Sequence, residues 1–263
     1  MILVKKGNQN LAPHQVYEDT IVAGSQHDHG NGFWSGSAHV FVRSGEGWDH
    51  QFKLLPPDGA ASEYFGCSVA IYEDTIVVGA FGDDDNGDFS GSAHVFARSG
   101  EEWTHQAKLL VPDGADWDFF GASVSIYGDP IVVGAPTVSG KNGSAHVFVR
   151  SGEEWSHQAK LLARQGDEGI HFESVAIYDD TIVVGAYVGD DNGGSEFCGS
   201  AFAYDRIGEE WTYRAKQPAP NGVKYEWFVE SVAIFKDTVV VGVPLDDYAG
   251  EDSGSAHVYH LLN

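Results

Sequence analysis

One loop of the sequence gathers oxygen ligands of the kind that hold a divalent cation. Its acidic and amide side chains are Asp83, Asp84, Asp85, Asn86 and Asp88. Ca²⁺ takes roughly six to eight oxygen ligands, which a loop of this density can supply. The spacing differs from that of an EF-hand loop, because no Gly follows three alternating acids in register. We therefore expect either a calcium site, with Ca²⁺ as the one cofactor that the sequence indicates, or a solvated acidic loop.

Aromatic side chains occur in loops of the same kind, where their rings could stack on the C–H faces of sugars. The rings predicted to bind a ligand are Trp34, Trp117, Tyr187, Trp227 and Tyr248. Asp and Asn side chains beside them can form hydrogen bonds to hydroxyl groups. A second set of rings occupies a repeated position, at Phe65, Phe120, Phe172 and Phe228. We expect this second set to pack in the interior, where a large ring contributes most to stability.

Histidines recur at two positions of a repeated pattern. The first position, in Ala-His-Val, holds His39, His94, His146 and His257, and the second, in Trp-x-His-Gln, holds His50, His105 and His157. A pair of these rings could ligate a transition metal. However, one copy of the pattern has Phe202 and Tyr213 instead, which a packing role permits and a metal role does not. We therefore expect cross-strand neighbours near the outside of each unit.

Two acids break the repeat, and they are the candidates for catalysis. Glu173 and Glu230 stand where other copies have Cys67 and Ala122. A polysaccharide lyase or a glycoside hydrolase would need such carboxylates close to the axis of the fold. The apolar runs expected near that axis, such as residues 76–78, carry no acid, and no Ser/His/Asp or Cys/His grouping stands out. Catalysis is therefore the least favoured of the functions that the sequence suggests.

All of these residues belong to a unit that occurs five times. The run Gly-Ser-Ala begins at Gly36, Gly91, Gly143, Gly199 and Gly254, at steps of 55, 52, 56 and 55 residues. A Trp follows at the same interval in the first four copies, at Trp48, Trp103, Trp155 and Trp211. Repeats of this length are typical of solenoids and propellers, and no segment shows a helical period.

Each unit contains four runs that read as strands. In the second copy they cover residues 68–72, 75–80, 91–98 and 103–110, with a polar loop over 82–90. The second run is rich in β-branched residues, as expected for a buried inner strand near the axis. Four antiparallel strands in about 50 residues are typical of a propeller blade. In such a blade the turns after the first and third strands share one face, and the long variable loops share the other.

The sequence thus predicts an all-β, five-bladed propeller that forms a single domain over residues 1–263. The expected blades cover residues 12–55, 65–110, 120–162, 172–217 and 228–262, the last together with 1–6. The fifth unit stops after its third strand, so we expect residues 1–6 to supply the fourth and to close the ring without an unpaired edge. The alternative is an open array that completes itself by oligomerising.

Short glycine motifs connect this repeat to a known family. Phe65-Gly66 and Phe120-Gly121, followed by Gly79-Ala80 and Gly134-Ala135-Pro136, resemble the FG-GAP repeats of the integrin α-subunit propeller, and most of all the short bacterial repeats of that type. The resemblance implies adhesion or ligand binding and an extracellular or cell-surface location. Two departures matter. Residues 72–75 are expected to form a tight turn where integrin repeats often hold calcium, and integrin heads have seven blades, so integrin-like ligand binding cannot be carried over residue by residue.

The amino-acid composition limits the classes of molecule that the protein can bind. A formal net charge of −24, from 39 acidic and 15 basic side chains, disfavours nucleic acids and anionic membranes but permits cations. No apolar run is long enough to span a membrane, and the apolar start of the chain is too short for a signal peptide. Cys67 and Cys198 occupy different positions in units that are not neighbours, so we expect no disulfide between them.

Three functions follow, in order of preference. The first is a non-catalytic binding or adhesion module that presents an acidic, aromatic-bearing loop face to a glycan or a protein, with Ca²⁺ as an aid. The second is a structural subunit that docks a partner protein, with oligomerisation open. The third is the lyase or hydrolase that would use Glu173 and Glu230.

Overall fold

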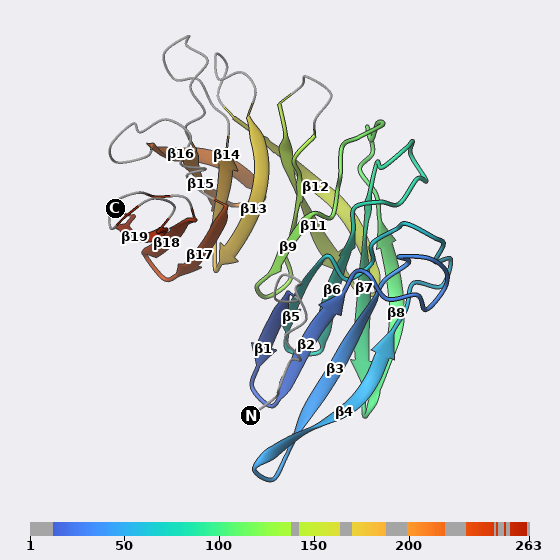
Figure 1. Cartoon of the computed structure of the whole chain (residues 1–263). Helices are drawn as coiled ribbons and strands as arrows, with labels where there is room; N and C mark the ends of the chain where they lie inside the picture. The colour runs from blue at the N-terminus through green and yellow to red at the C-terminus, as the bar shows by residue number, and fades with distance from the viewer. Residues whose placement is uncertain are drawn as a thin grey trace.

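The computed structural model describes residues 13–137, 142–163, 170–187, 199–218, 230–244, 246, 250 and 253–261. In these residues all regular structure is β, in five separate sheets that follow one another along the chain (Figure 1). We number the sheets as blades 1 to 5 and call their successive strands A to D. The predicted all-β, five-bladed propeller is confirmed.

The strands of each blade are antiparallel neighbours in chain order. Blade 1 holds β1 (His14–Tyr17), β2 (Thr20–Ser25), β3 (Ser37–Ser44) and β4 (Gly47–Leu54), and blade 2 holds β5 (Ser68–Tyr72), β6 (Thr75–Ala80), β7 (Ser92–Ser99) and β8 (Glu102–Leu109). Blade 3 holds β9 (Ser123–Ile126), β10 (Ile131–Ala135), β11 (Ser144–Ser151) and β12 (Glu154–Leu162). Blade 4 holds β13 (His171–Tyr178), β14 (Thr181–Tyr187), β15 (Ser200–Ile207) and β16 (Glu210–Pro218), and blade 5 holds β17 (Ser231–Phe235), β18 (Thr238–Val243) and β19 (Ser255–His260).

The A strands, and not the B strands, lie innermost. Successive A strands contact one another, in the pairs β1–β5, β5–β9, β9–β13 and β13–β17. The B strand is the second strand of its sheet, flanked by A and C. The expectation that the apolar B strand lines the axis is therefore wrong. In blades 2 to 4 its β-branched side chains are buried because neighbouring blades cover both of its faces.

The core lies between blades rather than inside them. Val77 and Val95 of blade 2 pack in one cluster with Phe120, Ile126 and Ile131 on the facing side of blade 3. The repeated Phe is fully buried in these interfaces at Phe65, Phe120 and Phe172, which confirms the predicted packing role. Phe228 lies outside the described residues. Burial of each ring contributes about 1.5–3 kcal/mol, so each blade depends on its neighbour for stability.

A close approach of two backbones explains the repeated glycines. Gly121 has φ +93°, and its N–H donates to the carbonyl of Gly134 at 3.0 Å. Its own carbonyl accepts a hydrogen bond from Ser68 Oγ of the preceding blade at 2.7 Å. A Cβ on Gly79 would lie 1.9 Å from that carbonyl oxygen. Only glycine fits there, so the two motifs mark where adjacent blades meet.

The loops divide between two ends of the blades, as the strand order requires. The tight A–B and C–D turns lie at one end, and the B–C and D–A loops lie at the other, which we call the loop face. Parallel bridges join Gly36 to Phe65 and Gly91 to Phe120, and so tie the B–C loops of blades 1 and 2 to the D–A loops that follow them. The segment 1–6, predicted to close the ring, and Cys198 lie outside the described residues. Within the described part of the chain, no helix is long and apolar enough to cross a membrane.

Candidate functional site

The B–C loops of the first two blades are built on one frame. The N–H of Gly36 donates to the carbonyl of Asp28 at 2.9 Å, and the N–H of Gly91 donates to that of Asp83 at 2.8 Å. The carboxylates of the same two aspartates accept bonds from Ser37 Oγ at 2.7 Å and from Ser92 Oγ at 3.0 Å. The two B–C loops therefore share one backbone arrangement and differ in the side chains that it carries. This is the usual arrangement of a binding loop.

Seven rings form a continuous row across the loop face, which we call the aromatic strip. Its members are Phe33, Trp34, Tyr64, Phe81, Phe89, Trp117 and Phe119. Ring centroids are 5.9 Å apart for Trp34 and Tyr64, 4.8 Å for Tyr64 and Phe81, and 5.9 Å for Phe81 and Phe119. Trp117 stacks on Phe89 at 5.0 Å with only 5° between the planes. The strip thus unites the loops of blades 1 and 2 into one surface.

The strip is held by strained backbone. Trp34, Phe89 and Trp117 have φ values of +54°, +53° and +66°, a region that bulky residues rarely adopt. The N–H of Trp117 donates to the carbonyl of Asp88 at 2.8 Å, which helps to fix this conformation. Each such residue costs about 1–3 kcal/mol, and strain of this kind clusters at functional sites. As a result Trp34 and Trp117 stay 38% and 43% exposed instead of folding into the core.

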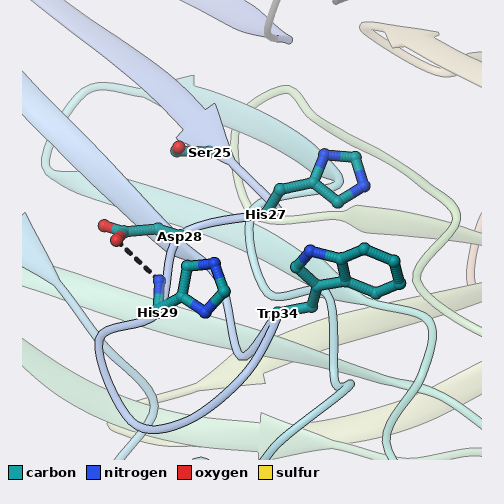
Figure 2. A pocket seen from close by; sticks show the side chains of 5 residues that line it. All are labelled: Ser25, His27, Asp28, His29 and Trp34. Atoms are coloured by element: carbon teal, nitrogen blue, oxygen red, sulfur yellow. Dashed lines mark hydrogen bonds between the residues drawn. The ribbon is translucent and has the colours of Figure 1, made fainter.

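A pocket opens beside the strip in blade 1 (Figure 2). It has a volume of about 380 Å³ and is lined by Ser25, His27, Asp28, His29 and Trp34. Figure 2 shows the rings of His27 and Trp34 beside each other, with Ser25 and Asp28 across from them, and the ring centroids lie 5.5 Å apart. Hydrogen bonds from Lys53 and Ser37 lower the pKa of Asp28 to about 2. The pocket therefore combines an aromatic wall with a carboxylate that remains ionised.

The sequence model of the FG-GAP repeat matches residues 48–96, 103–148, 155–204 and 211–259, which is more than half of the chain. The chain belongs to the FG-GAP repeat family. Each match begins at strand D of one blade and ends in strand C of the next, so the FG-GAP sequence unit spans a blade interface. No curated protein matches the chain. FG-GAP propellers are ligand-binding or structural modules, and their repeats are typical of extracellular or surface proteins.

In this FG-GAP propeller, a lysine accompanies the predicted calcium ligands of blade 2. Lys108 Nζ lies 2.7 Å from Asp83 and from Asp85, and 2.8 Å from Asp58 of the preceding D–A loop. Burial disfavours the ammonium, but its three carboxylate hydrogen bonds outweigh this and raise the pKa of Lys108. The described residues contain no group of three His, Cys, Asp or Glu side chains arranged to hold a metal. The calcium site stays a prediction, and the charge of Asp83 is balanced by Lys108.

The remaining predicted ligands serve the loop backbone. Asp84 Oδ1 accepts the N–H of Phe89 at 2.7 Å, and the Asn86 amide donates to the carbonyl of Val111 at 3.0 Å. The N–H of Asp88 donates to Asp116 Oδ1 at 3.1 Å. Each of these bonds braces the B–C loop or ties it to the next D–A loop, and so holds the aromatic strip in place.

Replacing Lys108 with Met tests this balance. Asp83 is almost completely buried, so loss of the ammonium leaves an uncompensated carboxylate and is expected to destabilise the protein by about 3–5 kcal/mol. Lys160→Met is the matched control, because Lys160 pairs with a largely exposed Asp113 and its loss should cost less than about 1 kcal/mol. Urea unfolding measures both. Equal losses would contradict the role of Lys108, and restoration of Lys108→Met by CaCl2 alone would show that the loop accepts a divalent cation.

Glu63, a buried acid beside Asp83, was not singled out from the sequence. Glu63 is buried in the D–A loop of blade 1, and its Oε2 has no hydrogen-bond partner among the residues that the structure describes. Burial, with the nearby charge of Asp83, raises the pKa of Glu63 to about 7. Its counterpart Asp118 accepts the N–H of Ala115 at 2.8 Å within the next D–A loop. An acid two residues before the repeated Phe in both copies was the signal that could have revealed this position.

The predicted histidine pairs are cross-strand neighbours. His94 Nδ1 lies 3.1 Å from His105 Nε2, and His94 Nε2 lies 3.2 Å from Ser92 Oγ, which in turn donates to Asp83. The same pair occurs at His146 and His157, 3.0 Å apart. The pairing is confirmed, but His94 and His146 are buried rather than near the surface, and this burial lowers the pKa of both rings to about 3.

The other predicted site residues are spread over the chain. Tyr187 ends β14, whereas Trp227 and Tyr248 lie outside the described residues. Glu173 lies in β13 at an irregularity in its pairing with β14, and Glu230 is exposed just before β17. The structure connects Trp34 to the rings of blade 2 through Tyr64 and Phe81, two residues that the sequence did not single out. Tyr64 directly precedes the repeated Phe, as Phe119 does in the next copy, and this recurrence was a usable signal.

Proposed function

We propose that this FG-GAP propeller is a non-catalytic binding module that acts outside the cell and takes a glycan on its loop face at blades 1 and 2. The observation that carries the proposal is Trp34, which is held exposed in a strained conformation on the wall of a pocket of about 380 Å³. Strained and exposed aromatic residues are poorly explained by stability alone, because a buried ring would contribute more.

The chemistry of the pocket suits a sugar ring. Trp34 offers a flat apolar face, while Ser25, His27 and Asp28 offer hydrogen-bond donors and acceptors at the edge. A volume of this size lies within the usual range for small-ligand sites. The strip continues from Trp34 to Trp117, so further sugar units of an oligosaccharide would find further rings. Because the rings are fixed before binding, little entropy is lost when the ligand arrives.

The net charge selects among glycans. A chain of net charge −24 repels uronic acids and sulfated sugars, and it accepts neutral or amino sugars. We therefore expect neutral or amino-sugar oligomers to bind and polyanionic polysaccharides to be rejected, most clearly at low ionic strength.

Binding to a glycan array, followed by calorimetry with the best oligosaccharide, tests the proposal. Trp34→Ala and Trp117→Ala should each weaken binding about 30-fold, the loss typical of an aromatic residue that anchors a ligand. Ile207→Ala is the control, because Ile207 is an exposed apolar residue in a C–D turn at the opposite end of the blades. Unchanged affinity in both Trp variants, or absence of glycan binding together with capture of one protein partner, would overturn it. Loss of binding in EDTA would add calcium to the site.

A further inference from the structure

Blade 5 exposes an apolar surface whose equivalent is buried in blade 2. We call the side of a blade that faces the next blade along the chain its forward face. In blade 2 this face includes Ala70, Val77, Ala93 and Val95, all of which are buried against blade 3. The alternation of side chains along antiparallel strands fixes which residues share the face.

Blade 5 carries the same residue types at the equivalent positions. Its forward face comprises Ala233, Val240, Ala256 and Val258, with Val240 paired to both Ala233 and Val258 in register. All four are exposed, Val258 to 60%. The opposite face of this blade, with Val239 and Val241, is buried against blade 4. An apolar sheet face left in water is a strong indication of an interface.

A row of rings along the A strands ends at the same surface. Successive ring centroids lie 5.1 Å apart for Tyr17 and Tyr72, 5.0 Å for Tyr72 and Tyr127, 4.6 Å for Tyr127 and Tyr178, and 5.1 Å for Tyr178 and Phe235. Phe235 is 62% exposed, and among the described residues no ring contact joins it to Tyr17. The row therefore has two open ends, one on blade 5 and one on blade 1.

Blade 1 offers the complementary surface on its backward face, the side that in blades 2 to 5 packs on the preceding blade. Val16 is 55% exposed, and Ile21 and Phe41 are half-buried. Their counterparts in blade 3 are Ile126, Ile131 and Phe148, which pack into the forward face of blade 2.

We propose that the forward face of blade 5 packs against the backward face of blade 1 of a second copy of this chain, so that copies associate head to tail. Every interface inside the chain pairs a forward face with a backward face, and the two open faces keep the apolar residues of that pairing. An interface between two different surfaces of one protein is heterologous, so association proceeds to a ring of copies or to an open series. Because each copy carries a net charge of −24, salt should strengthen the association.

Sedimentation velocity over a range of protein and NaCl concentrations is the first test. We expect masses above the 28.4 kDa of one chain at high protein concentration, increasing with salt. Val258→Lys should weaken association at least about tenfold, since it places a charge in the apolar contact. Val258 is exposed in the single chain, so this variant should keep its thermal midpoint. Ile207→Lys, the same change at an exposed site in blade 4 away from both faces, should associate as the parent does.

Cross-linking decides which surfaces meet. In a background with Cys67→Ala and Cys198→Ser, one chain carries Phe235→Cys and another carries Tyr17→Cys, and a short bis-maleimide is added. We expect dimers only when the two chains are mixed. Cross-linking of the Phe235→Cys chain with itself would contradict the head-to-tail arrangement. A monomer at all concentrations, or a cross-link within one chain that carries both cysteines, would overturn the proposal in favour of a closed ring.

Discussion

Gly79→Ala should destabilise the protein by about 4 kcal/mol or more, the range reached only when a substitution disrupts a packed core. The new Cβ would lie 1.9 Å from the carbonyl oxygen of Gly121. The Cβ is fixed directly to the backbone of one blade and the oxygen belongs to the backbone of the other, so neither atom can move alone. Relief requires separating blade 2 from blade 3. That separation would break the bond from Ser68 Oγ to the same carbonyl and loosen the cluster around Phe120. Urea unfolding of the purified variant gives the loss directly.

The chain supplies its own control for this prediction. Gly242 occupies the same position in blade 5, where the nearest atom to an added Cβ among the described residues is the rotatable Ser231 Oγ and no carbonyl of another described blade lies close. Gly242→Ala should therefore cost less than about 1 kcal/mol when measured in dilute protein. Equal losses in the two variants would mean that glycine is required by the strand itself and not by the approach of the next blade.

The fold could be predicted from the sequence because the same residue pattern recurs five times. Where one blade packs on the next, the backbone needs a glycine at the close approach and an apolar B strand covered on both faces, so Gly79 and Val77 of blade 2 reappear as Gly134 and Val132 of blade 3. One copy alone would be ambiguous, whereas a periodic set of turns and strands leaves few architectures. The order in which the strands follow one another outward from the axis was harder to predict. β-branched residues indicate that a strand is buried on two faces, but they do not show whether the central axis or the adjacent blades bury it.

The site was predictable only in part, because it depends on which loops become neighbours. Trp34 and Trp117 were found as exposed rings, yet the row that joins them passes through Tyr64 and Phe81, which sit on different blades. No local pattern shows that these rings meet, since their separation is set by the angle between blades. The same holds for Lys108, which reaches one carboxylate from the preceding D–A loop and two from its own blade. The density of aspartates in residues 83–88 suggested a cation site, whereas in the structure the balancing positive charge is that of Lys108 on strand β8.

Acidification should destabilise the protein, and the buried histidines determine the pH range in which stability is lost. Their folded-state pKa is about 3 at His94 and at His146, below the ordinary value of 6.5, because burial disfavours the charged ring. The unfolded chain therefore binds more protons below about pH 6.5, and stability falls as the pH drops from there toward 3. At about pH 5 the loss amounts to about 2 kcal/mol for each of the two rings. Glu63 acts in the opposite direction. Its pKa of about 7 is raised, so its carboxyl destabilises the fold when ionised and less so as the pH falls.

Blade 4 shows how to remove one acid-sensitive pair without designing a new core. It has a buried Phe202 and a partly buried Tyr213 where blades 1 to 3 have His, and these rings pack in the cluster between blades 3 and 4. The double variant His146→Phe with His157→Tyr copies that pair into blade 3. Between about pH 7.5 and pH 5 it should lose about 2 kcal/mol less stability than the parent, whatever its stability at neutral pH. Glu63→Gln should have the reverse effect, a steeper loss of stability between about pH 7.5 and pH 5, because it removes the carboxyl that opposes the histidines. Urea unfolding at the two pH values gives the free energy of unfolding of the parent and of both variants. An unchanged pH dependence in the double variant would mean that His146 is protonated in the folded state.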